Sequence, residues 1–530
     1  MNNLFLSRFI VVIIFLILTY LSASIIISNC ESNYIYPLDD TYIHLSISKN
    51  LAEKGIWGVT GHEFTSSSSS ILYTLILSLF TFIGGSNDIL PLIINIFIFY
   101  FIILFLYSFF KPVIFISGKE KTNQIASLLI LSLIVLTLII EFPLVALTMS
   151  GMEHSLQILI NLTFINLFIR YISENESKAL TKLYLISILV PLVRYEGIFI
   201  IALALFFLIL KKEYKNFWKL MIFSSSAIIF YGIISIYNGW YFLPNSILLK
   251  SNKPTSFDII SIINYILSWV IKLISEKHLL TIVISSSAIL WFNLKLRLPV
   301  YSNRNLWLVF TLVLIPLHLA FAKTGWVYRY EAYLVAIGLI SIMYNSIEIF
   351  KYADLKLRNL IVVMMLLTLF ANGLRAYDSL VNVPTMSKNI YHQQYQMAKF
   401  ISKYNNKSTV VLGDIGACCY YTDIKLIDLV ALGSLETLKL KIDKKFTKKE
   451  IFKLAESKNA EIAILYKDAF SEFIPEQWIE LESWKISDNK GCFKDIVTFY
   501  SIKTEKFIEQ KLNLEEFSKD LPIEVQRLNN

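Results

Sequence analysis

The stretch IVVIIFLILTYLSASIIISNCESNYIYPLDD, residues 10–40, decides the fold class of this chain. Residues 10–27 carry no charge, and they have the length and composition of a membrane-spanning helix. Two adjacent carboxylates, Asp39 and Asp40, follow after a short polar segment. Acids beside a bilayer cost solvation free energy unless they hold a cation or a reacting hydroxyl group. The pair is therefore where we first expect chemistry.

Apolar blocks of similar length recur as far as Tyr377, and the 530 residues are 55% hydrophobic with a mean hydropathy of +0.59. A soluble protein of this composition would need an implausibly large dry core. Residues 10–27 are too long for a typical signal peptide, and no cleavage site of small residues follows, so we expect a retained first span. The chain is predicted to be a polytopic α-helical membrane protein.

The formal net charge of +9 does not indicate nucleic-acid binding. From residue 381 onward the chain has 22 basic and 21 acidic residues, so the excess lies in the membrane part. There the basic residues gather in loops, which is typical of the positive-inside rule rather than of a phosphate-binding stripe.

The four cysteines, Cys30, Cys418, Cys419 and Cys492, show no metal-binding spacing. Cys418 and Cys419 would be strained as a pair, so at most one of them can bridge Cys492. We favour structural or free thiols, and the pairing of Cys492 stays open.

Basic loops set the expected topology. With the N-terminus inside, five loops rich in lysine and arginine fall on one side of the membrane. This requires about eleven spans, an odd number, which places the C-terminal segment outside. The expected spans are 9–28, 88–110, 125–147, 154–171, 183–193, 197–210, 220–237, 278–294, 305–322, 330–348 and 359–377.

Two further apolar stretches must then lie along the outer surface instead of crossing. Residues 71–83 are short for a span, and residues 257–273 carry a charge near each end. The spans 183–193 and 197–210 are also short, and the break between them suggests a polar cavity that opens from outside.

The composition changes from about residue 384, where lysine, glutamate and asparagine rise and apolar runs shorten. Strand-length apolar runs are found at 409–412, 425–427 and 461–465, and a helical pattern is found at 448–458. They predict a small α/β domain. We therefore expect a transmembrane catalytic domain over 1–380 and an extracytoplasmic α/β domain over 381–530.

The uncommon polar residues of the membrane part collect on the outer side in this topology, where they define a candidate site. The candidates are Asp39, Asp40, Lys49, Glu153, His154, Arg194, Glu196, Asn245, Lys250, Arg329 and Tyr330. The structural alternative for the acidic pair is a helix cap at Asp40 or Thr41. A cap needs one acid, so the second acid favours a catalytic role.

The other candidates have structural alternatives too. Glu153 at a helix start complements the helix dipole. Arg194 and Glu196 either neutralise each other or hold a lipid-linked phosphate. The aromatic loop 237–250 either belongs to the interfacial belt or stacks on sugar rings. Arg329 either snorkels to the interface or is a second phosphate ligand.

Six motifs in order resemble the GT-C superfamily, polytopic glycosyltransferases that use polyprenyl-phosphate donors. They are Asp39-Asp40-x-Tyr-Ile, Lys49-Asn-Leu-Ala-Glu-x-Gly55, Ser150-Gly-Met-Glu153, Arg194-x-Glu196-Gly197, Leu243-Pro-Asn-Ser246 with Lys250, and Arg329-Tyr330. The likeness is greatest to the bacterial branch that includes mycobacterial arabinofuranosyltransferases. In the tail, 413–417 and 427–430 also resemble that branch. The chain departs from it at Ser46 and Lys49, where arginines are usual, and at Tyr195, where proline is usual.

The resemblance implies transfer of a hexosyl or pentosyl unit from a polyprenyl-phosphate donor to an envelope glycan or lipid, on the outer face of a bacterial inner membrane. A carboxylate of the acidic pair would be the general base, and Arg194, Lys250 or Arg329 would stabilise the departing phosphate. We assign the base to Asp39, and to Asp40 a cap or a divalent cation, Mg²⁺ or Mn²⁺, which the reaction does not require.

Two rival functions remain at this stage. A transporter or flippase of lipid-linked glycans usually shows repeated halves and charges at mid-span, whereas this chain has no evident repeat. An O-antigen polymerase also faces outward, but it is not expected to open with an acidic pair beyond its first span.

Overall fold

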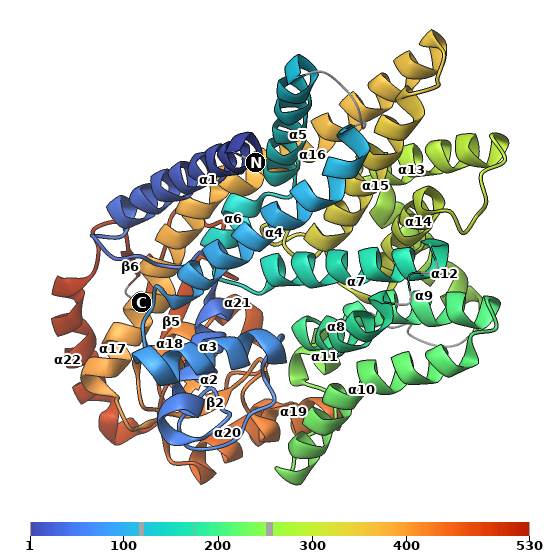
Figure 1. The fold of residues 1–530 in the computed structure, drawn as a ribbon. Coiled ribbons are helices and arrows are strands. Elements are labelled where there is room, and N and C mark those ends of the chain that lie inside the picture. The colour runs from blue at the N-terminus through green and yellow to red at the C-terminus, as the bar shows by residue number, and fades with distance from the viewer. Residues whose placement is uncertain (1, 116–120, 175, 177, 251–257, 529–530) are drawn as a thin grey trace.

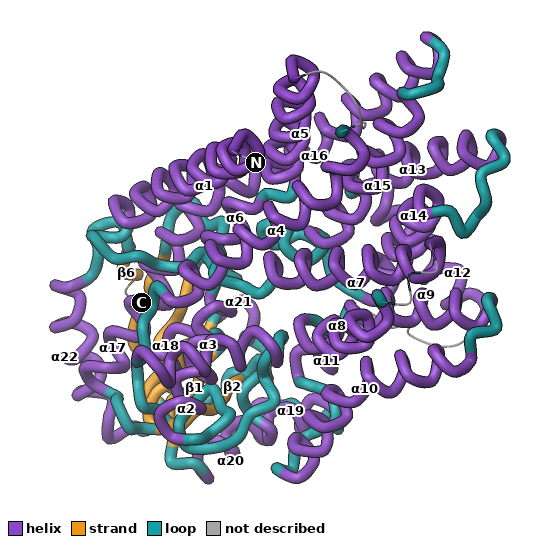
Figure 2. The backbone as a smooth tube through the Cα atoms, viewed as in Figure 1, coloured by secondary structure: helices purple, strands orange, loops and turns teal. Residues whose placement is uncertain are grey.

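A computed structural model describes residues 2–115, 121–174, 176, 178–250 and 258–528. Long helices fill the upper and right-hand part of Figure 1, and a smaller sheet-containing part lies at the lower left. Figure 2 shows that the strands are confined to that smaller part. The predicted polytopic helical fold with a C-terminal α/β region is confirmed.

Each of the eleven expected spans is a helix. They are α1 (Asn2–Asn29), α4 (Leu90–Ile114), α5 (Lys121–Glu141), α7 (His154–Glu174), α8 (Ala179–Val193), α9 (Gly197–Leu210), α10 (Tyr214–Tyr237), α13 (Lys277–Lys295), α14 (Asn303–Phe321), α15 (Ala332–Phe350) and α16 (Leu355–Ile390). Within the described ranges, nine helices are long and apolar enough to cross a membrane, and α8 and α9 are shorter, as expected.

One predicted boundary is wrong. The span expected over 125–147 ends at Glu141, and a separate short helix, α6 (Leu144–Met149), follows it. Pro143 lies between them; proline has no backbone N–H and cannot continue the hydrogen-bonding pattern of α5. After the break, residues 150–153 lie at the same end of the helical part as α2 (Asp39–Lys54). A hydrogen bond joins the two segments: Thr41 Oγ1 donates to the carbonyl oxygen of Ser150 at 2.7 Å.

The two predicted surface helices are α3 (Ile71–Gly84) and α12 (Ile259–Ser275). Ser70 caps α3 by accepting a hydrogen bond from the Tyr73 amide, and α3 packs against α2. None of the α12 side chains is buried, and its isoleucines are widely exposed. Two hydrogen bonds to the end of α14 hold α12, one from Tyr265 to Ala320 and one from Lys272 to Ala322. This arrangement fits a helix lying in a membrane interface.

The C-terminal part is built on a six-stranded mixed sheet of order β2-β1-β3-β5-β4-β6. Its strands are β1 (Thr409–Leu412), β2 (Lys425–Asp428), β3 (Ala460–Leu465), β4 (Ile479–Lys485), β5 (Ile496–Ser501) and β6 (Gln526–Leu528). The three predicted strands form its parallel half, with Val410 opposite Leu426 and Ile462. The antiparallel half was not predicted.

Helix α16 joins the two parts. It continues past residue 380 to Ile390, through a π-helical turn η1 (Tyr391–Tyr395), into α17 (Gln396–Tyr404). The other helices of the sheet part are α18 (Gly416–Tyr421), α19 (Leu435–Ile442), α20 (Lys448–Ser457), α21 (Lys467–Phe470) and α22 (Phe507–Phe517). Helix α18 packs on α2, so segments far apart in the sequence meet where the helical part and the sheet-containing part join.

Candidate active site

A cavity of about 310 Å³ lies where α2, the α8–α9 break and the loop 322–331 meet. Its polar lining comprises Asp40, His44, Ser67, Ser69, Arg194, Glu196, Ser246, Lys323, Arg329 and Tyr330. Its apolar lining comprises Ile43, Met152, Tyr195, Ile198, Phe199, Leu243, Ile247, Phe321, Ala322 and Leu432. One cavity therefore offers charged groups and an apolar wall, as an amphipathic ligand requires.

Arg329 is the most deeply placed cation of this cavity, with only 1% of its surface exposed. Its Nη2 donates to the Asp40 carboxylate and, at 3.0 Å, to the Tyr330 hydroxyl. Its Nε and Nη1 are buried and have no hydrogen-bond partner among the described residues. A buried guanidinium with unused donors is costly unless an acceptor completes it, and carboxylate or phosphate oxygens match its geometry.

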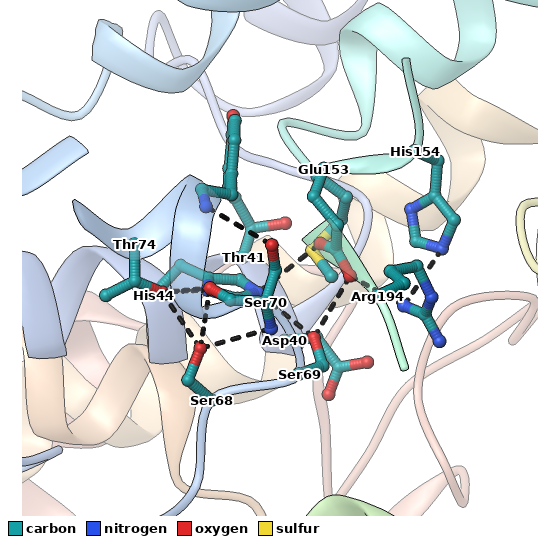
Figure 3. A network of polar contacts seen from close by, with 12 residues as sticks. Asp40, Thr41, His44, Ser68, Ser69, Ser70, Thr74, Glu153, His154 and Arg194 are labelled. Carbon is teal, nitrogen blue, oxygen red and sulfur yellow. Dashed lines mark hydrogen bonds and ion pairs between the residues drawn. The ribbon is translucent and has the colours of Figure 1, made fainter. Parts of the chain in front are cut away.

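Arg194 forms a second charged centre in the break between α8 and α9. It is in extended conformation, with φ −162° and ψ 141°, so it ends α8 and directs its side chain to Glu153 and Glu196. Nη1 lies 2.6 Å from Glu153 and Nη2 lies 2.8 Å from Glu196. Figure 3 shows Glu153 and Arg194 facing each other beside His154, whose Nε2 is 3.3 Å from Arg194 Nη1.

Glu153 is fully buried and is surrounded by polar groups on several sides. Burial alone would raise the pKa of Glu153, but the imidazoles of His154 and His44 and the guanidinium of Arg194 hold it well below its usual range. Ser69 donates to Glu153 at 3.1 Å, and His44 Nε2 lies 3.4 Å away. Glu153 is therefore held as a carboxylate that fixes Arg194.

Tyr330 links the two charged centres. The guanidinium of Arg329 lies 4.9 Å from the centre of its ring and that of Arg194 lies 5.4 Å from it. Two guanidinium groups against one ring bring two cations to the same wall of the cavity. Such a pair can divide the charge of one phosphate between them.

Asp39 does not line this cavity. Its carboxylate accepts hydrogen bonds from the backbone amides of Gly416 and Ala417, at 2.7 and 2.8 Å, in the C-terminal part. Burial and the nearby Asp414 raise the pKa of Asp39 to about 8, against the lowering effect of the two amides. Adjacent residues at the start of α2 thus point to different partners, and the role of base expected for Asp39 does not fit this geometry. Of the two adjacent acids, Asp40 is the one that lines the cavity.

The expected capping role also differs. Helix α2 begins at Asp39, with Leu38 in the capping position and no side-chain capping bond. Both acids lie in the first turn, where a negative charge complements the helix dipole. Neither Asp40 nor Thr41 caps α2.

An unusual turn carries Arg329. Four successive residues, Gly325 to Tyr328, have positive φ values of 84°, 52°, 64° and 54°. Non-glycine residues in this region are strained, and they persist where surrounding contacts hold them. Here Glu331 accepts from the Gly325 amide, while Ser379 and Arg375 of α16 donate to the Val327 and Tyr328 carbonyls at 2.8 and 2.6 Å.

Two further predicted residues, Lys49 and Asn245, do not line this cavity. Lys49 donates to the Tyr420 carbonyl at 3.2 Å, on the face of α2 that meets the C-terminal part. Asn245 donates to the carbonyls of Ala431 and Leu432, which fixes Leu432 at the cavity wall. The side chain of Lys250 falls outside the described part of the chain.

Sequence reasoning missed His44, Ser67, Ser69 and Lys323. His44 is four residues after Asp40, one helical turn away on the same face, and this spacing was an available signal. The serines lie in the low-complexity tract 66–70, which carries no chemical motif of its own. Lys323 had no neighbouring motif; it is exposed and forms no ion pair within the described ranges.

The residues around Asp40 do not form a typical divalent-cation site. The Asp40 carboxylate is paired with Arg329, and the described residues contain no group of three His, Cys, Asp or Glu side chains that could hold a metal. Divalent cations prefer several oxygen ligands. The predicted cation at Asp40 stays a prediction. All four cysteines are buried and unpaired.

Residues 388–500 match a family described as "Domain of unknown function (DUF8728)". No curated protein of similar sequence was found. Among solved structures, the chain is similar to ArnT from Cupriavidus metallidurans, both bound to undecaprenyl phosphate and in the apo state. In each case identity is 9%, the TM-score is 0.49, and the match covers 92% of this chain and 98% of ArnT. At this level we draw nothing from the likeness about activity.

Proposed function

We propose that this protein is a membrane glycosyltransferase. It transfers one sugar from a polyprenyl-phosphate donor to an envelope glycan or lipid acceptor on the outer face of a bacterial inner membrane. The sugar class, hexosyl or pentosyl, is left open by the chemistry of the cavity.

One observation supports this proposal above the others, the unused donors of Arg329 beside a carboxylate in a half-apolar cavity. Nε and Nη1 lie on different edges of the guanidinium, and each can donate to one ligand oxygen while Nη2 holds Asp40. The apolar residues of α9 and α14, such as Phe199 and Phe321, suit the first units of a polyprenyl chain.

Asp40 is placed to act as the general base. Its carboxylate takes the proton of an acceptor hydroxyl group, whose oxygen forms a bond to the anomeric carbon of the donor sugar. The bond between that carbon and the phosphate oxygen breaks, and the electron pair leaves with polyprenyl phosphate. Arg329, Arg194 and Lys323 stabilise the negative charge that grows on the phosphate.

Three helices that connect the cavity to basic loops support the proposed orientation. Glu196 precedes α9 and Lys211 follows it. Arg304 lies in the first turn of α14, and Lys323 follows the end of that helix. Helix α15 lies between the loop that carries Arg329 and Lys351. In each case the cavity residue and the opposite basic residue lie at different ends of one helix. The positive-inside rule then supports a cavity and a C-terminal part that face outward.

The test is a transfer assay with the purified full-length chain in lipid nanodiscs. Radiolabelled polyprenyl-phosphate pentose and hexose are offered with envelope glycolipid, and product is measured with and without EDTA. Transfer that is abolished by Asp40→Asn supports the proposal. Movement of a lipid-linked glycan across vesicles without cleavage of the sugar–phosphate bond would support a flippase and overturn it.

A further inference from the structure

A second cavity, of about 390 Å³, lies away from the first and shares no lining residue with it. It forms where three distant segments meet, the stretch 32–35 after α1, the loop 86–89 before α4, and Tyr395 and Tyr421 of the C-terminal part. A cavity at such a junction exists only in the assembled chain, so its side chains are positioned by all three segments.

Three tyrosine rings form its aromatic surface, and contacts hold them in place. The rings of Tyr395 and Tyr421 lie 5.2 Å apart at an angle of 88°, so their faces are perpendicular. Tyr34 donates to the Met149 carbonyl at 3.3 Å, and Tyr421 donates to Asp88 at 2.6 Å. The C–H face of a pyranose or furanose ring packs against the electron-rich face of such a ring, and fixed rings lose little entropy on binding.

The polar groups around these rings offer both donors and acceptors. Asp88 accepts one bond on each oxygen, from Tyr420 and Tyr421, and each oxygen keeps a further lone pair. Asn87 accepts from the Ile89 amide at 2.9 Å, which leaves its NH₂ group to donate. The hydroxyl groups of Ser32 and Tyr395 form no hydrogen bond within the described ranges. Alternating donors and acceptors match a ligand rich in hydroxyl groups.

The charge of the lining excludes other ligands. Asp88 is the charged residue among the lining residues, and no lysine or arginine is among them. A phosphate or an anionic lipid would meet a carboxylate without a compensating cation. The lining also lacks the continuous apolar wall of the first cavity, so a lipid tail has little to pack against.

We propose that the cavity between Tyr34, Tyr395 and Tyr421 binds an uncharged saccharide segment of the acceptor glycan, at a distance from the reaction cavity. This inference rests on the proposed function for the identity of the glycan. The binding site itself is independent of catalysis, since it shares no residue with the first cavity.

The test measures saccharide binding directly, without a donor. Uncharged and anionic short-chain saccharide fractions are released from envelope polysaccharide of the source strain and titrated into the full-length protein by calorimetry. Tyr395→Ala should weaken binding of the uncharged fraction about tenfold, since it removes one stacking face. Asn87→Asp keeps the acceptor for the Ile89 amide but loses the NH₂ donors, and it should weaken binding several-fold.

Two controls separate this inference from the proposed function. Tyr237→Ala changes a tyrosine that is 90% exposed and should leave binding unchanged. Arg329→Gln should lower transfer but retain saccharide binding; a loss of saccharide binding would show that the two cavities are one site. Binding of the anionic fraction alone, no binding, or binding unaffected by both Tyr395→Ala and Asn87→Asp would overturn the inference.

Discussion

Two buried arginines meet the same loop and use it differently. Arg329 and Arg375 are 1% and 3% exposed. Arg375 donates to the backbone carbonyls of Tyr328 and Glu141, and it lies 3.7 Å from the buried Glu331. Arg329 donates only to side chains, Asp40 and Tyr330, and two of its nitrogens have no partner among the described residues.

The difference shows that burial of charge does not by itself identify a site. Arg375 Nη1 and Nη2 donate to backbone carbonyls, and its Nε has no hydrogen bond within the described ranges but lies 3.7 Å from Glu331, so Arg375 supports the left-handed turn at 325–328. Arg329 is presented by that turn to a cavity with an apolar wall. The two cations differ because Arg375 is fixed by backbone carbonyls and a buried carboxylate, whereas Arg329 lines a cavity and has two nitrogens without a hydrogen bond among the described residues.

The largest expected effect concerns the carboxylate beside Arg329. Asp40→Asn should lower the transfer rate by about 10²–10⁴-fold, because an amide cannot take the proton of the acceptor. Asp39→Asn is the matched neighbour, and it should keep most of the activity because Asp39 contacts amides of the C-terminal part. Turnover of both variants decides between them. If Asp39→Asn is inactive and Asp40→Asn is active, the assignment of the base is reversed.

The next effect concerns stability around Arg375. Arg375→Gln should lower the free energy of unfolding by about 3–5 kcal/mol, because it leaves the fully buried Glu331 without its guanidinium. The double variant Arg375→Gln/Glu331→Gln should recover part of this loss. Thermal unfolding in detergent measures both. A single variant that melts like the native protein would contradict the supporting role of Arg375.

A smaller effect is expected when Arg329 itself is changed. Arg329→Gln should weaken binding of polyprenyl phosphate about 10–100-fold, through the loss of about 1.5–3 kcal/mol of charge-assisted hydrogen bonds. The melting temperature should fall less than in Arg375→Gln, because the Asp40 side chain is 31% exposed and can be hydrated. Equal lipid affinity of Arg329→Gln and the native protein would remove Arg329 from the phosphate site.

The smallest effect is a pH dependence from Asp39. Its folded-state pKa is raised from 3.8 to about 8, so the folded protein binds more protons than the unfolded chain between these values. The contribution of Asp39 to stability therefore declines as the pH rises from about 4 to about 8. Asp39→Asn should flatten this part of a plot of melting temperature against pH. An unchanged slope would show that Asp39 is ionised throughout.

Much of the helical fold could be predicted because apolar length and basic loops are local signals. All eleven expected spans are helices, and residues 71–84 and 259–275 lie outside them as expected. The span over 125–147 was predicted without regard to Pro143, which divides it. Strand β4 is only partly buried and β6 is short and exposed, which gives weak patterns; β5 is buried along nearly its whole length, and its apolar run was an available signal.

The candidate site was predicted in its residues more than in their roles. Asp40, Arg194, Glu196, Arg329 and Tyr330 meet at one cavity, with Glu153 directly behind Arg194. The sequence could not distinguish Asp39 from Asp40, because the difference depends on two amides that lie 377 and 378 positions further along the chain. Lys323 was missed because its place depends on the left-handed turn that follows it.

The bond between Asp39 and Gly416 has a consequence for biosynthesis. The fit is close, since a side chain at residue 416 would lie 2.0 Å from the Asp39 carbonyl, so glycine is required there. The ribosome makes α2 long before it makes residue 416. During that interval α2 lacks the partner that α18 provides in the complete chain. This contact therefore forms only late in translation, and chains that stop before the sheet part leave one face of α2 uncovered.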